Sequence, residues 1–435
     1  MSTADNFRTF LSNLRIDNHR TIENRYRGVT RSLNKHFRKS QSKAHNLQVG
    51  SYGRWTAIKG VSDLDMLYIV PDGDWDKYNK EGGQVRLLAD TKAAIQDRYS
   101  RTTIKIDRSV VCIKFKTFQV EVQPVFKQTD GSFRFPDTYK GGSWKNTKPK
   151  DEIRATSEID AAQNRNFRKL CKMLRAWKNK NGLGIGGLLI DTLAYNFLSQ
   201  TNEYATKSFG SYDCMVRDFF LYASNLKYQE RYSALGSRQH VKVKQNFQRP
   251  AKKSYAQALK AIEAAGQKDE GEQWRKLFGP VFPTTRGVNR AGMESINSSV
   301  HTFDYTEEFI EDLAPVDIRY PLIIDCDVKQ NGFRETLLSA LISSGFPLQA
   351  RKTLNFKIMS NDVPPPYSVK WKVLNIGYEA EKRNCIRGYI TDDSGHESIE
   401  EHTSFKGDHT VECYIIKDGF VVARNEVIVP ISETL

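Results

Sequence analysis

Residues 48–70 read QVGSYGRWTAIKGVSDLDMLYIV, and this stretch decides the expected fold. It contains the pair Gly50-Ser51, followed by Asp63 and Asp65 at the start of an apolar run. Because side chains alternate along a strand, Asp63 and Asp65 lie on the same face. The apolar run that follows predicts a buried strand that carries both carboxylates near one end.

The chemistry of this stretch points to an anionic ligand and a cation. Two carboxylates on one side of a strand repel each other unless a cation lies between them. Glycine lets the backbone approach a phosphate closely, and the following amides and a serine hydroxyl can donate to it. Each feature alone is weak, since a D-x-D pair is common on surfaces and Gly-Ser is an ordinary turn. Together they are typical of metal-assisted nucleotide transfer.

A third acid is expected on a neighbouring strand, and Glu121 in the run FQVEVQPVF is the best candidate. Val120 and Val122 face one side of this strand, and Glu121 faces the other. If the valines pack into a core, Glu121 faces the same cleft as Asp63 and Asp65. Three carboxylates can hold two divalent ions about 4 Å apart. Magnesium suits an all-oxygen site that shares its ligands with phosphates, with Mn²⁺ as the alternative.

Several stretches carry a resemblance to a known family. GSYGRWTAIKGVSDLDMLYIV resembles the signature of polymerase-β-like nucleotidyltransferases, and more narrowly that of the bacterial CD-NTases, the cyclic-oligonucleotide synthases of anti-phage signalling. VEVQPVF is similar to the family's third-acid strand, NFRKLCKMLRAWKNKNG to its helix ending near a tryptophan, and EQWRKLFGPVFP to the end of its catalytic core. The resemblance covers residues 5–285 approximately.

The resemblance implies roles for individual residues. Asp63, Asp65 and Glu121 would be catalytic and would ligate two Mg²⁺ ions. Gly50 and Ser51 would hold the β- and γ-phosphates of a nucleoside triphosphate.

A predicted helix over residues 164–180 supplies two further nucleotide-binding candidates, Lys172 and Arg175. Arg168, Lys172 and Arg175 share one flank at helical spacing, so a solvated basic edge is the alternative interpretation. The chain departs from the family at three positions. Glu121 stands where most members have aspartate, Arg175 where many have lysine, and Gly187 near where many have serine.

The fold class expected is α+β. A polymerase-β-like nucleotidyltransferase sheet with an N-terminal helix is predicted over residues 1–160, a mostly α-helical second lobe over 161–302, and an all-β domain over 303–435. Helical periodicity is found over 5–40 (as one helix or two), 164–180, 186–198, 213–228 and 250–277, and a loop is predicted over 136–150.

The C-terminal domain is predicted from alternating strands of Greek-key or sandwich type, with Asp418-Gly419 as a hairpin turn. PPYSVKWKVLNIGYEA, RGYI, HTVECYIIKDG and VVAR closely resemble the AGS-C sensor domain, which implies that it senses a ligand. Tyr367, Trp371 and His409 are aromatic, but we interpret them as packing residues rather than as ligand contacts.

Charge is uneven along the chain. The net charge is +15 overall, +18 over residues 1–314 and −3 over residues 315–435. Seven basic residues and no acid lie between Arg238 and Lys260. This stretch is interpreted as a solvated surface, with a wall of the substrate channel as the first alternative. An activating nucleic acid is a further alternative, which would make activity steeply salt-dependent.

Composition bounds the remaining classes. The six cysteines show no metal-ligand or disulfide pattern, and reduced thiols suit the cytosol. The sequence shows no signal peptide and no apolar run of membrane-spanning length. A cytoplasmic enzyme without membrane contact is therefore expected.

The function predicted is a Mg²⁺-dependent synthesis of a cyclic di- or trinucleotide from nucleoside triphosphates, ATP among them, in CBASS-type anti-phage signalling. The product would act on a separate effector protein, and regulatory proteins are possible partners. The alternatives are a transferase that makes linear products on RNA or protein, and a nucleotide-binding sensor without catalysis. No motif fixes the bases, the ring size, the linkage, the base-stacking residues or the trigger.

Overall fold

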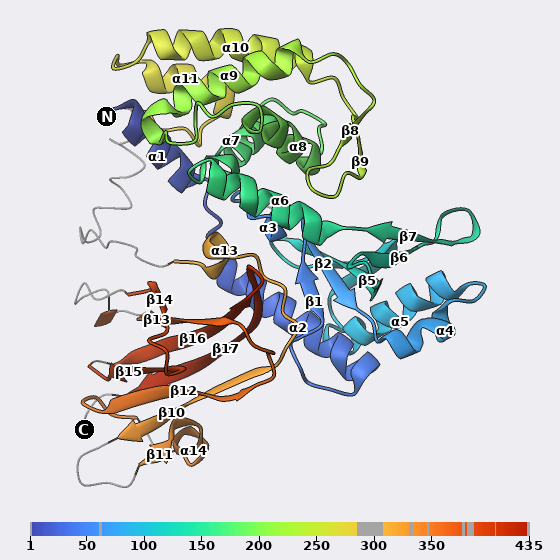
Figure 1. Ribbon diagram of the computed structural model, residues 1–435, viewed down its shortest axis with the longest axis vertical. Helices are drawn as coiled ribbons and strands as arrows, with labels where there is room; N and C mark the ends of the chain where they lie inside the picture. The colour runs from blue at the N-terminus through green and yellow to red at the C-terminus, as the bar shows by residue number, and fades with distance from the viewer. Residues whose placement is uncertain are drawn as a thin grey trace. The chain divides into compact units, whose positions relative to one another are not determined.

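The computed structural model of the 435-residue chain describes residues 2–60, 63–284, 308–329, 335–345, 348–375, 379–380, 387–404 and 406–432. The chain divides into two compact units, shown together in Figure 1. The first unit contains Met1–Lys39 and Gln48–Val300, and the second contains Ser40–Leu47 and His301–Leu435. Each unit is described by itself.

A mixed sheet organises the first part of the first unit, here named the sheet lobe (residues 19–39 and 48–147). Its strand order is β1-β2-β5-β4-β3, and β6 and β7 continue from β5. The strands are β1 (Asn46–Gln48), β2 (Asp63–Ile69), β3 (Thr103–Asp107), β4 (Val110–Lys114), β5 (Gln119–Lys127), β6 (Phe133–Asp137) and β7 (Ser143–Thr147). The helices are α2 (His19–Arg38), α3 (Gly50–Gly53), α4 (Trp75–Tyr78) and α5 (Gly83–Arg98), with short 3₁₀ turns at Asp72–Asp74 and Tyr139–Gly141.

Helices α2 and α5 lie side by side and pack against this sheet. Leu64, Met66 and Tyr68 of β2 are buried. The ring of Tyr68 lies 5.6 Å from that of Phe37 in α2, and its hydroxyl donates to Asn34 Oδ1 at 3.1 Å. Because side chains alternate along a strand, the acidic residues of β2 point away from α2.

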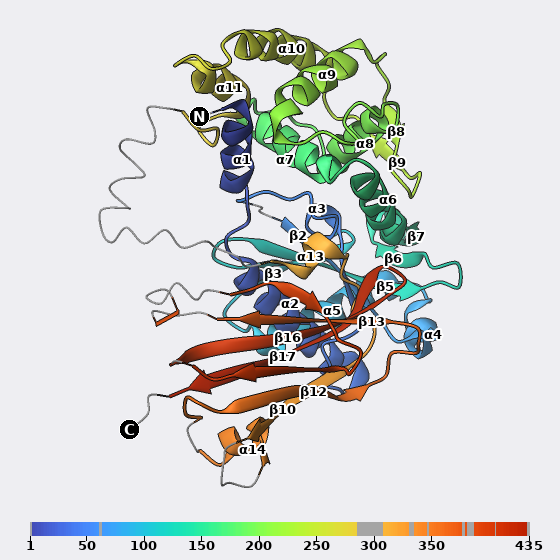
Figure 2. The same ribbon diagram turned by 60° about the vertical axis from the view of Figure 1, so that its left-hand side comes forward.

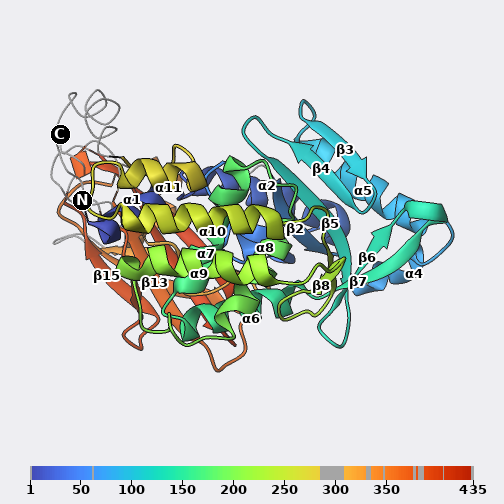
Figure 3. The same ribbon diagram turned by 90° about the horizontal axis from the view of Figure 1, so that it is seen from above.

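The helical lobe (residues 149–284) completes the first unit. It contains α6 (Pro149–Ala162), α7 (Asn166–Lys180), α8 (Gly187–Leu198), α9 (Tyr212–Asn225), α10 (Gln248–Glu263) and α11 (Glu270–Phe278), a 3₁₀ turn (Phe209–Ser211) and the hairpin β8 (Arg231–Ser233) and β9 (His240–Lys242). Pro149 begins α6, where its missing amide costs no hydrogen bond. Figure 3 shows α10 lying along both α9 and α11.

Helix α1 (Thr3–Asn13) belongs to the core of the helical lobe, although it lies at the N-terminus. The ring of Phe7 lies 5.1 Å from Trp274 and 5.3 Å from Phe282. Phe10 lies 4.7 Å from Phe278. The two ends of the first unit are therefore joined by one aromatic cluster. The predicted division at residue 160 stays a prediction.

The Phe7→Ala variant is expected to lose about 3–5 kcal/mol of unfolding free energy, because it removes a fully buried ring from this cluster. Chemical denaturation measures the loss. Tyr228→Ala is the control, since Tyr228 is 62% exposed and its truncation should change stability by less than about 0.5 kcal/mol. Equal effects of the two changes would contradict the packing described for α1.

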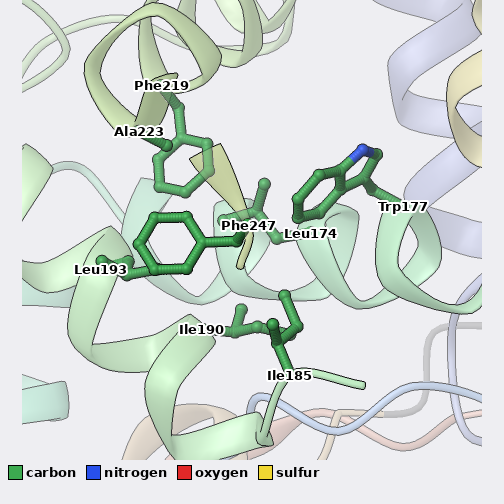
Figure 4. Close-up of a pocket in the computed structure, with 8 residues that line it drawn as sticks. All are labelled: Leu174, Trp177, Ile185, Ile190, Leu193, Phe219, Ala223 and Phe247. Carbon is green, nitrogen blue, oxygen red and sulfur yellow. The ribbon is translucent and has the colours of Figure 1, made fainter. Parts of the chain in front are cut away.

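A small cavity lies inside the helical lobe (Figure 4). Its lining is entirely apolar and consists of Leu174, Trp177, Ile185, Ile190, Leu193, Phe219, Ala223 and Phe247. An apolar lining offers no partner for a phosphate or a base, and such cavities stay dry. We therefore assign this cavity to core packing rather than to ligand binding.

Three sequence predictions are corrected or refined here. The helical pattern over 5–40 forms two helices, α1 and α2, and the pattern over 250–277 also forms two, α10 and α11. The loop predicted over 136–150 is wrong, because Pro136 and Trp144 pair across the β6–β7 hairpin. Lys140, Gly141 and Gly142 lie in the turn, where the two glycines adopt φ values of +89° and +99°.

The second unit consists of two four-stranded antiparallel sheets, ordered β11-β10-β12-β15 and β14-β13-β16-β17. Figure 2 shows β13, β16 and β17 side by side. The bounds are β10 (Leu322–Lys329), β11 (Thr336–Leu337), β12 (Thr353–Asn361), β13 (Ser368–Leu374), β14 (Ile390–Asp392), β15 (Ser398–His402), β16 (Gly407–Lys417), β17 (Phe420–Ile431), α13 (Ile310–Leu313) and α14 (Leu338–Ser343). The predicted β-rich domain is confirmed, and the two short helices were not predicted. Of the strand predicted over 385–390, residues 385 and 386 lie outside the described residues, residues 387–389 are not in a strand, and Ile390 begins β14.

The predicted hairpin turn and packing residues of this unit can be located. Asp418 and Gly419 join β16 to β17 with φ values of +53° and +76°. Trp371 is buried, and its indole Nε1 donates to Asp393 Oδ1 at 2.9 Å. Tyr367 donates its hydroxyl to Glu397 at 2.7 Å. Both aromatic side chains thus hold the segment between β14 and β15, and His409 is also buried.

No helix in the described parts of the chain combines the length and apolarity that a membrane crossing requires. Within the same residues five cysteines are free thiols.

Candidate active site

The Gly50-Ser51 pair begins α3, a single helical turn that lies between β1 and β2. Gly50 has a φ of +65°, a conformation that strains any residue with a Cβ atom. A Cβ built at Gly50 would lie 1.8 Å from Oδ2 of Asp65. The turn therefore packs directly on the Asp65 carboxylate, and both the conformation and the contact require glycine.

Hydrogen bonds close this turn around the Ser51 carbonyl. It accepts the amides of Thr56 at 2.9 Å and Ala57 at 3.1 Å. The Arg54 amide donates to the Gly50 carbonyl at 3.1 Å. The first amides of a helical turn have no acceptor inside it. The Ser51 hydroxyl makes no hydrogen bond within the described part of the chain, so the turn offers donors to an anion.

The three predicted carboxylates meet on one face of the sheet. Asp65 on β2 lies directly opposite Glu121 on the parallel strand β5, and Asp63 lies opposite Gln119. Asp63 is exposed, whereas Asp65 and Glu121 are half-buried. The alternate valines of β5 are buried, as the sequence predicted. Glu121 therefore faces the aspartates and not the hydrophobic interior. The catalytic and metal-binding roles of the three stay predictions.

The electrostatics of this face favour a bound cation. Burial raises the pKa of the Asp65 carboxyl; the Arg54 guanidinium lowers this pKa, and the charge of Asp63 raises it. The pKa of Glu121 is also raised, first by burial and then by the charges of Asp65 and Asp63. A divalent cation relieves the repulsion between such like charges, and an all-carboxylate set suits Mg²⁺.

The carboxylates are not yet arranged as ligands. Glu121 Oε1 accepts a hydrogen bond from Gln119 Nε2 at 2.8 Å. In the described residues no three His, Cys, Asp or Glu side chains are positioned to hold a metal ion. Side-chain rotation, including the release of Glu121 from Gln119, would therefore accompany metal binding. The residues present fit Mg²⁺ by their chemistry and by their common face.

Helix α2 holds the backbone of Asp65, a function that the sequence did not reveal. The Tyr26 hydroxyl donates to the Asp65 carbonyl at 2.9 Å, and the Val49 amide donates to the same oxygen at 3.1 Å. Tyr26 is buried. Tyr26 lies within the helical pattern predicted over residues 5–40. A helical pattern indicates which side chains share a face, but it does not indicate the hydrogen-bond partner of a side chain.

Lys172 reaches the neighbourhood of the Gly50-Ser51 turn from α7. Its Nζ lies 5.6 Å from the ring centroid of Trp55, the second residue after α3. The side chain is only half-buried. A nucleotide-binding role for Lys172 is compatible with this position and stays a prediction.

Arg175 points into the helical lobe. It is 7% exposed, and its guanidinium donates to Asp191 Oδ1 at 2.6 Å and Oδ2 at 3.0 Å. It also donates to the Gly187 carbonyl at 3.3 Å. Arg168 is buried as well. The alternative interpretation, in which these side chains form a solvated basic edge of the helix, is therefore wrong for both arginines. The nucleotide-binding role of Arg175 stays a prediction, and its contacts support a structural role.

The sequence also missed a buried ionic cluster behind the turn. Arg54 donates from Nε to Asp191 at 3.0 Å and from Nη1 to Glu152 at 3.0 Å. The Thr56 hydroxyl donates to Asp191 at 3.0 Å. Arg54 and Thr56 follow the Gly-Ser pair, but Asp191 lies 137 residues beyond Arg54, and no local pattern joins them.

The basic stretch from Arg238 to Lys260 lies on the surface. All seven of its basic side chains are exposed: Arg238, Lys242, Lys244, Arg249, Lys252, Lys253 and Lys260. None forms an ion pair with any residue that the structure describes. The solvated surface and the nucleic-acid alternative both remain compatible with this exposure.

Two protein families match the sequence. Residues 1–160 match the Second Messenger Oligonucleotide or Dinucleotide Synthetase domain, abbreviated SMODS. Residues 304–432 match the Adenylyl/Guanylyl and SMODS C-terminal sensor domain, abbreviated AGS-C.

Individual relatives are distant. A cyclic GMP-AMP synthase of Escherichia albertii is 23% identical over 320 residues, which cover 71% of this chain and 66% of that synthase. A cyclic AMP-AMP-AMP synthase of Acinetobacter sp. is 23% identical over 287 residues, which cover 62% of this chain and 81% of that synthase. The solved complex of E. coli MS115-1 CdnC with HORMA-deltaN has 14% identity and a TM-score of 0.47, covering 64% of this chain and 98% of that one. The chain is therefore a bacterial CD-NTase, a nucleotidyltransferase with an N-terminal SMODS domain and a C-terminal AGS-C sensor domain.

Proposed function

We propose that this CD-NTase makes a cyclic di- or trinucleotide second messenger from nucleoside triphosphates, with ATP as one substrate. The observation that carries the proposal is the parallel register that sets Asp65 opposite Glu121, next to the turn of Gly50. Two of its relatives are named as synthases of cyclic GMP-AMP and cyclic AMP-AMP-AMP, and both of these products contain AMP.

Each residue of the site is assigned one task. The first amides of α3 and the Ser51 hydroxyl bind the triphosphate, because they are donors without acceptors inside the turn. Asp63, Asp65 and Glu121 would hold Mg²⁺, which when bound neutralises phosphate charge and activates a ribose hydroxyl. Tyr26 holds the Asp65 backbone in place from α2. Gly50 keeps the triphosphate turn in contact with the Asp65 carboxylate.

A linear-product transferase would use the same carboxylates, so the product must be identified directly. The purified protein is incubated with the four nucleoside triphosphates and Mg²⁺, treated with phosphatase and measured by mass spectrometry. A cyclic product has no terminal phosphate, keeps its mass and resists phosphatase. Only linear, phosphatase-sensitive products would replace the proposal with the linear alternative. Nucleotide binding without any product would favour the non-catalytic sensor.

The biological setting is proposed from the family alone. The cyclic product would act on a separate effector protein in anti-phage signalling of the CBASS type. The free cysteines within the described residues are compatible with a cytoplasmic location. The AGS-C unit would bind a regulatory ligand.

A further inference from the structure

A single buried carboxylate, that of Asp191 on α8, accepts hydrogen bonds from two other parts of the first unit, namely α7 and the segment that follows α3. Asp191 is fully buried. Its Oδ1 accepts from Arg175 of α7, and its Oδ2 accepts from Arg175, from Arg54 Nε and from the Thr56 hydroxyl. Four donors thus meet the two oxygens of this carboxylate. This number of bonds nearly fills the acceptor capacity of one carboxylate.

The charge of Asp191 is stable under all conditions in which the enzyme would work. Burial alone would raise the pKa of Asp191, but the charges of Arg175 and Arg54 outweigh it and hold the pKa at about 2. Because the folded pKa lies below the ordinary value of an aspartate, the stabilising contribution is present above about pH 4 and is lost only as the pH falls towards 2. The cluster is therefore a fixed support and not a pH switch.

The donors that bind Asp191 are also the residues that close the phosphate-binding turn. Thr56 donates its hydroxyl to Asp191 and its amide to the Ser51 carbonyl, and Arg54 donates its guanidinium to Asp191 and its amide to the Gly50 carbonyl. A shift of the Asp191 carboxylate therefore displaces both residues of the Gly-Ser pair through bonds of 3.1 Å or less.

Gly187 explains how Arg175 reaches this cluster. A Cβ built at Gly187 would lie 3.3 Å from Arg175 Nη2, closer than most side chains tolerate. Arg175 Nη2 also donates to the Gly187 carbonyl at 3.3 Å, so the two residues are in direct contact. The arginine and the glycine form a matched pair that turns the guanidinium to Asp191.

We propose that Asp191 is a positioning residue, which holds the Gly50-Ser51 turn against the helical lobe through Arg54 and Thr56. By fixing the position of the turn, Asp191 sets the affinity for the triphosphate. Asp191 touches no substrate itself. This proposal rests on the proposed function, since the ligand of the turn is taken to be a nucleoside triphosphate.

The experiment measures the Kd of a non-hydrolysable ATP analogue, with Mg²⁺, for the full-length chain. Asp191→Asn is expected to raise this Kd about tenfold or more, because misplacing binding groups by about 1 Å can cost up to 10²-fold. The matched control is Asp160→Asn. Asp160 is also buried in the helical lobe and also lies beside an arginine, Arg168, but it does not contact the turn. This control is expected to lower the melting temperature and leave the Kd unchanged.

A second pair of variants keeps the test decisive if Asp191→Asn does not fold. Thr56→Val removes the hydroxyl that binds Asp191 and keeps the amide that binds the Ser51 carbonyl, without changing any charge. Its control is Thr192→Val, whose hydroxyl donates to the Leu188 carbonyl of the same helix at 2.8 Å. Thr56→Val is expected to raise the Kd, and Thr192→Val is not.

The outcomes separate the two proposals. If the variants in contact with the turn and their controls change the Kd equally, the positioning role of Asp191 is overturned while the proposed function stands. If the wild-type protein binds the analogue but forms no product, the proposed synthesis fails, and the Kd values still test the positioning role of Asp191. A Kd that rises in Asp191→Asn and Thr56→Val but not in their controls supports this role.

Discussion

The Glu121→Gln variant is expected to lose product formation by a factor on the order of 10² or more, while its affinity for nucleoside triphosphate changes little. The reason is the geometry of the sheet, in which Glu121 lies directly opposite Asp65, so that the charge of Asp65 raises the pKa of Glu121. Glutamine keeps the shape of the side chain and removes its negative charge. The measurement pairs the rate of product formation, followed by mass spectrometry, with direct titration of nucleotide.

The control for this change is Glu158→Gln, the same substitution at an exposed glutamate of α6. It should leave the rate unchanged. A Glu121→Gln protein that still forms product at the wild-type rate would remove Glu121 from the site. It would also favour a protein that holds nucleotide without using the third carboxylate.

The Gly50→Ala variant is expected to lose activity on a similar scale, about 10²-fold, through displacement of the turn. The added Cβ would lie 1.8 Å from Asp65 Oδ2, so the turn, the carboxylate or both must move. The left-handed backbone of Gly50 adds a strain of about 1–2 kcal/mol. Activity and thermal stability are measured together, since the clash acts at the site and the strain acts on folding.

Gly82→Ala separates these two contributions. Gly82 has nearly the same backbone conformation, with φ at +68°, and a Cβ there would meet nothing within 4 Å. The control should therefore show the strain without the loss of activity. If Gly50→Ala were no less active than Gly82→Ala, the close approach of the turn to Asp65 would have no functional meaning.

The local pattern was sufficient to predict the carboxylate-bearing strands. The alternation in DLDMLYI and QVEVQPVF fixes which side chains share a face, and this property depends on the strand alone. That Glu121 lies on a strand beside β2 was expected from the need for a third acid and not from the alternation itself. The sequence analysis misassigned the β6–β7 hairpin, because the polar strand β7 (SWKNT) lacks the apolar alternation that marks a buried sheet.

Contacts between distant segments account for what the sequence could not reveal. In the β6–β7 hairpin, Asp137 accepts bonds from Arg108 and Lys145 and so stabilises strands of low apolar content. Likewise, the bond of Arg54 to Asp191 is decided by the packing of α3 against α8. Neither contact has a periodic signature, whereas an apolar face has one.

The central claim is that Asp63, Asp65 and Glu121 hold divalent ions beside the Gly50-Ser51 turn. It is tested most directly by crystallography of the protein with Mn²⁺ and a non-hydrolysable triphosphate, using the anomalous signal of manganese. We expect manganese bound to oxygens of all three carboxylates, with Glu121 released from Gln119 and the triphosphate bound at the turn. Manganese bound elsewhere, or triphosphate bound while Glu121 stays paired with Gln119, would contradict it.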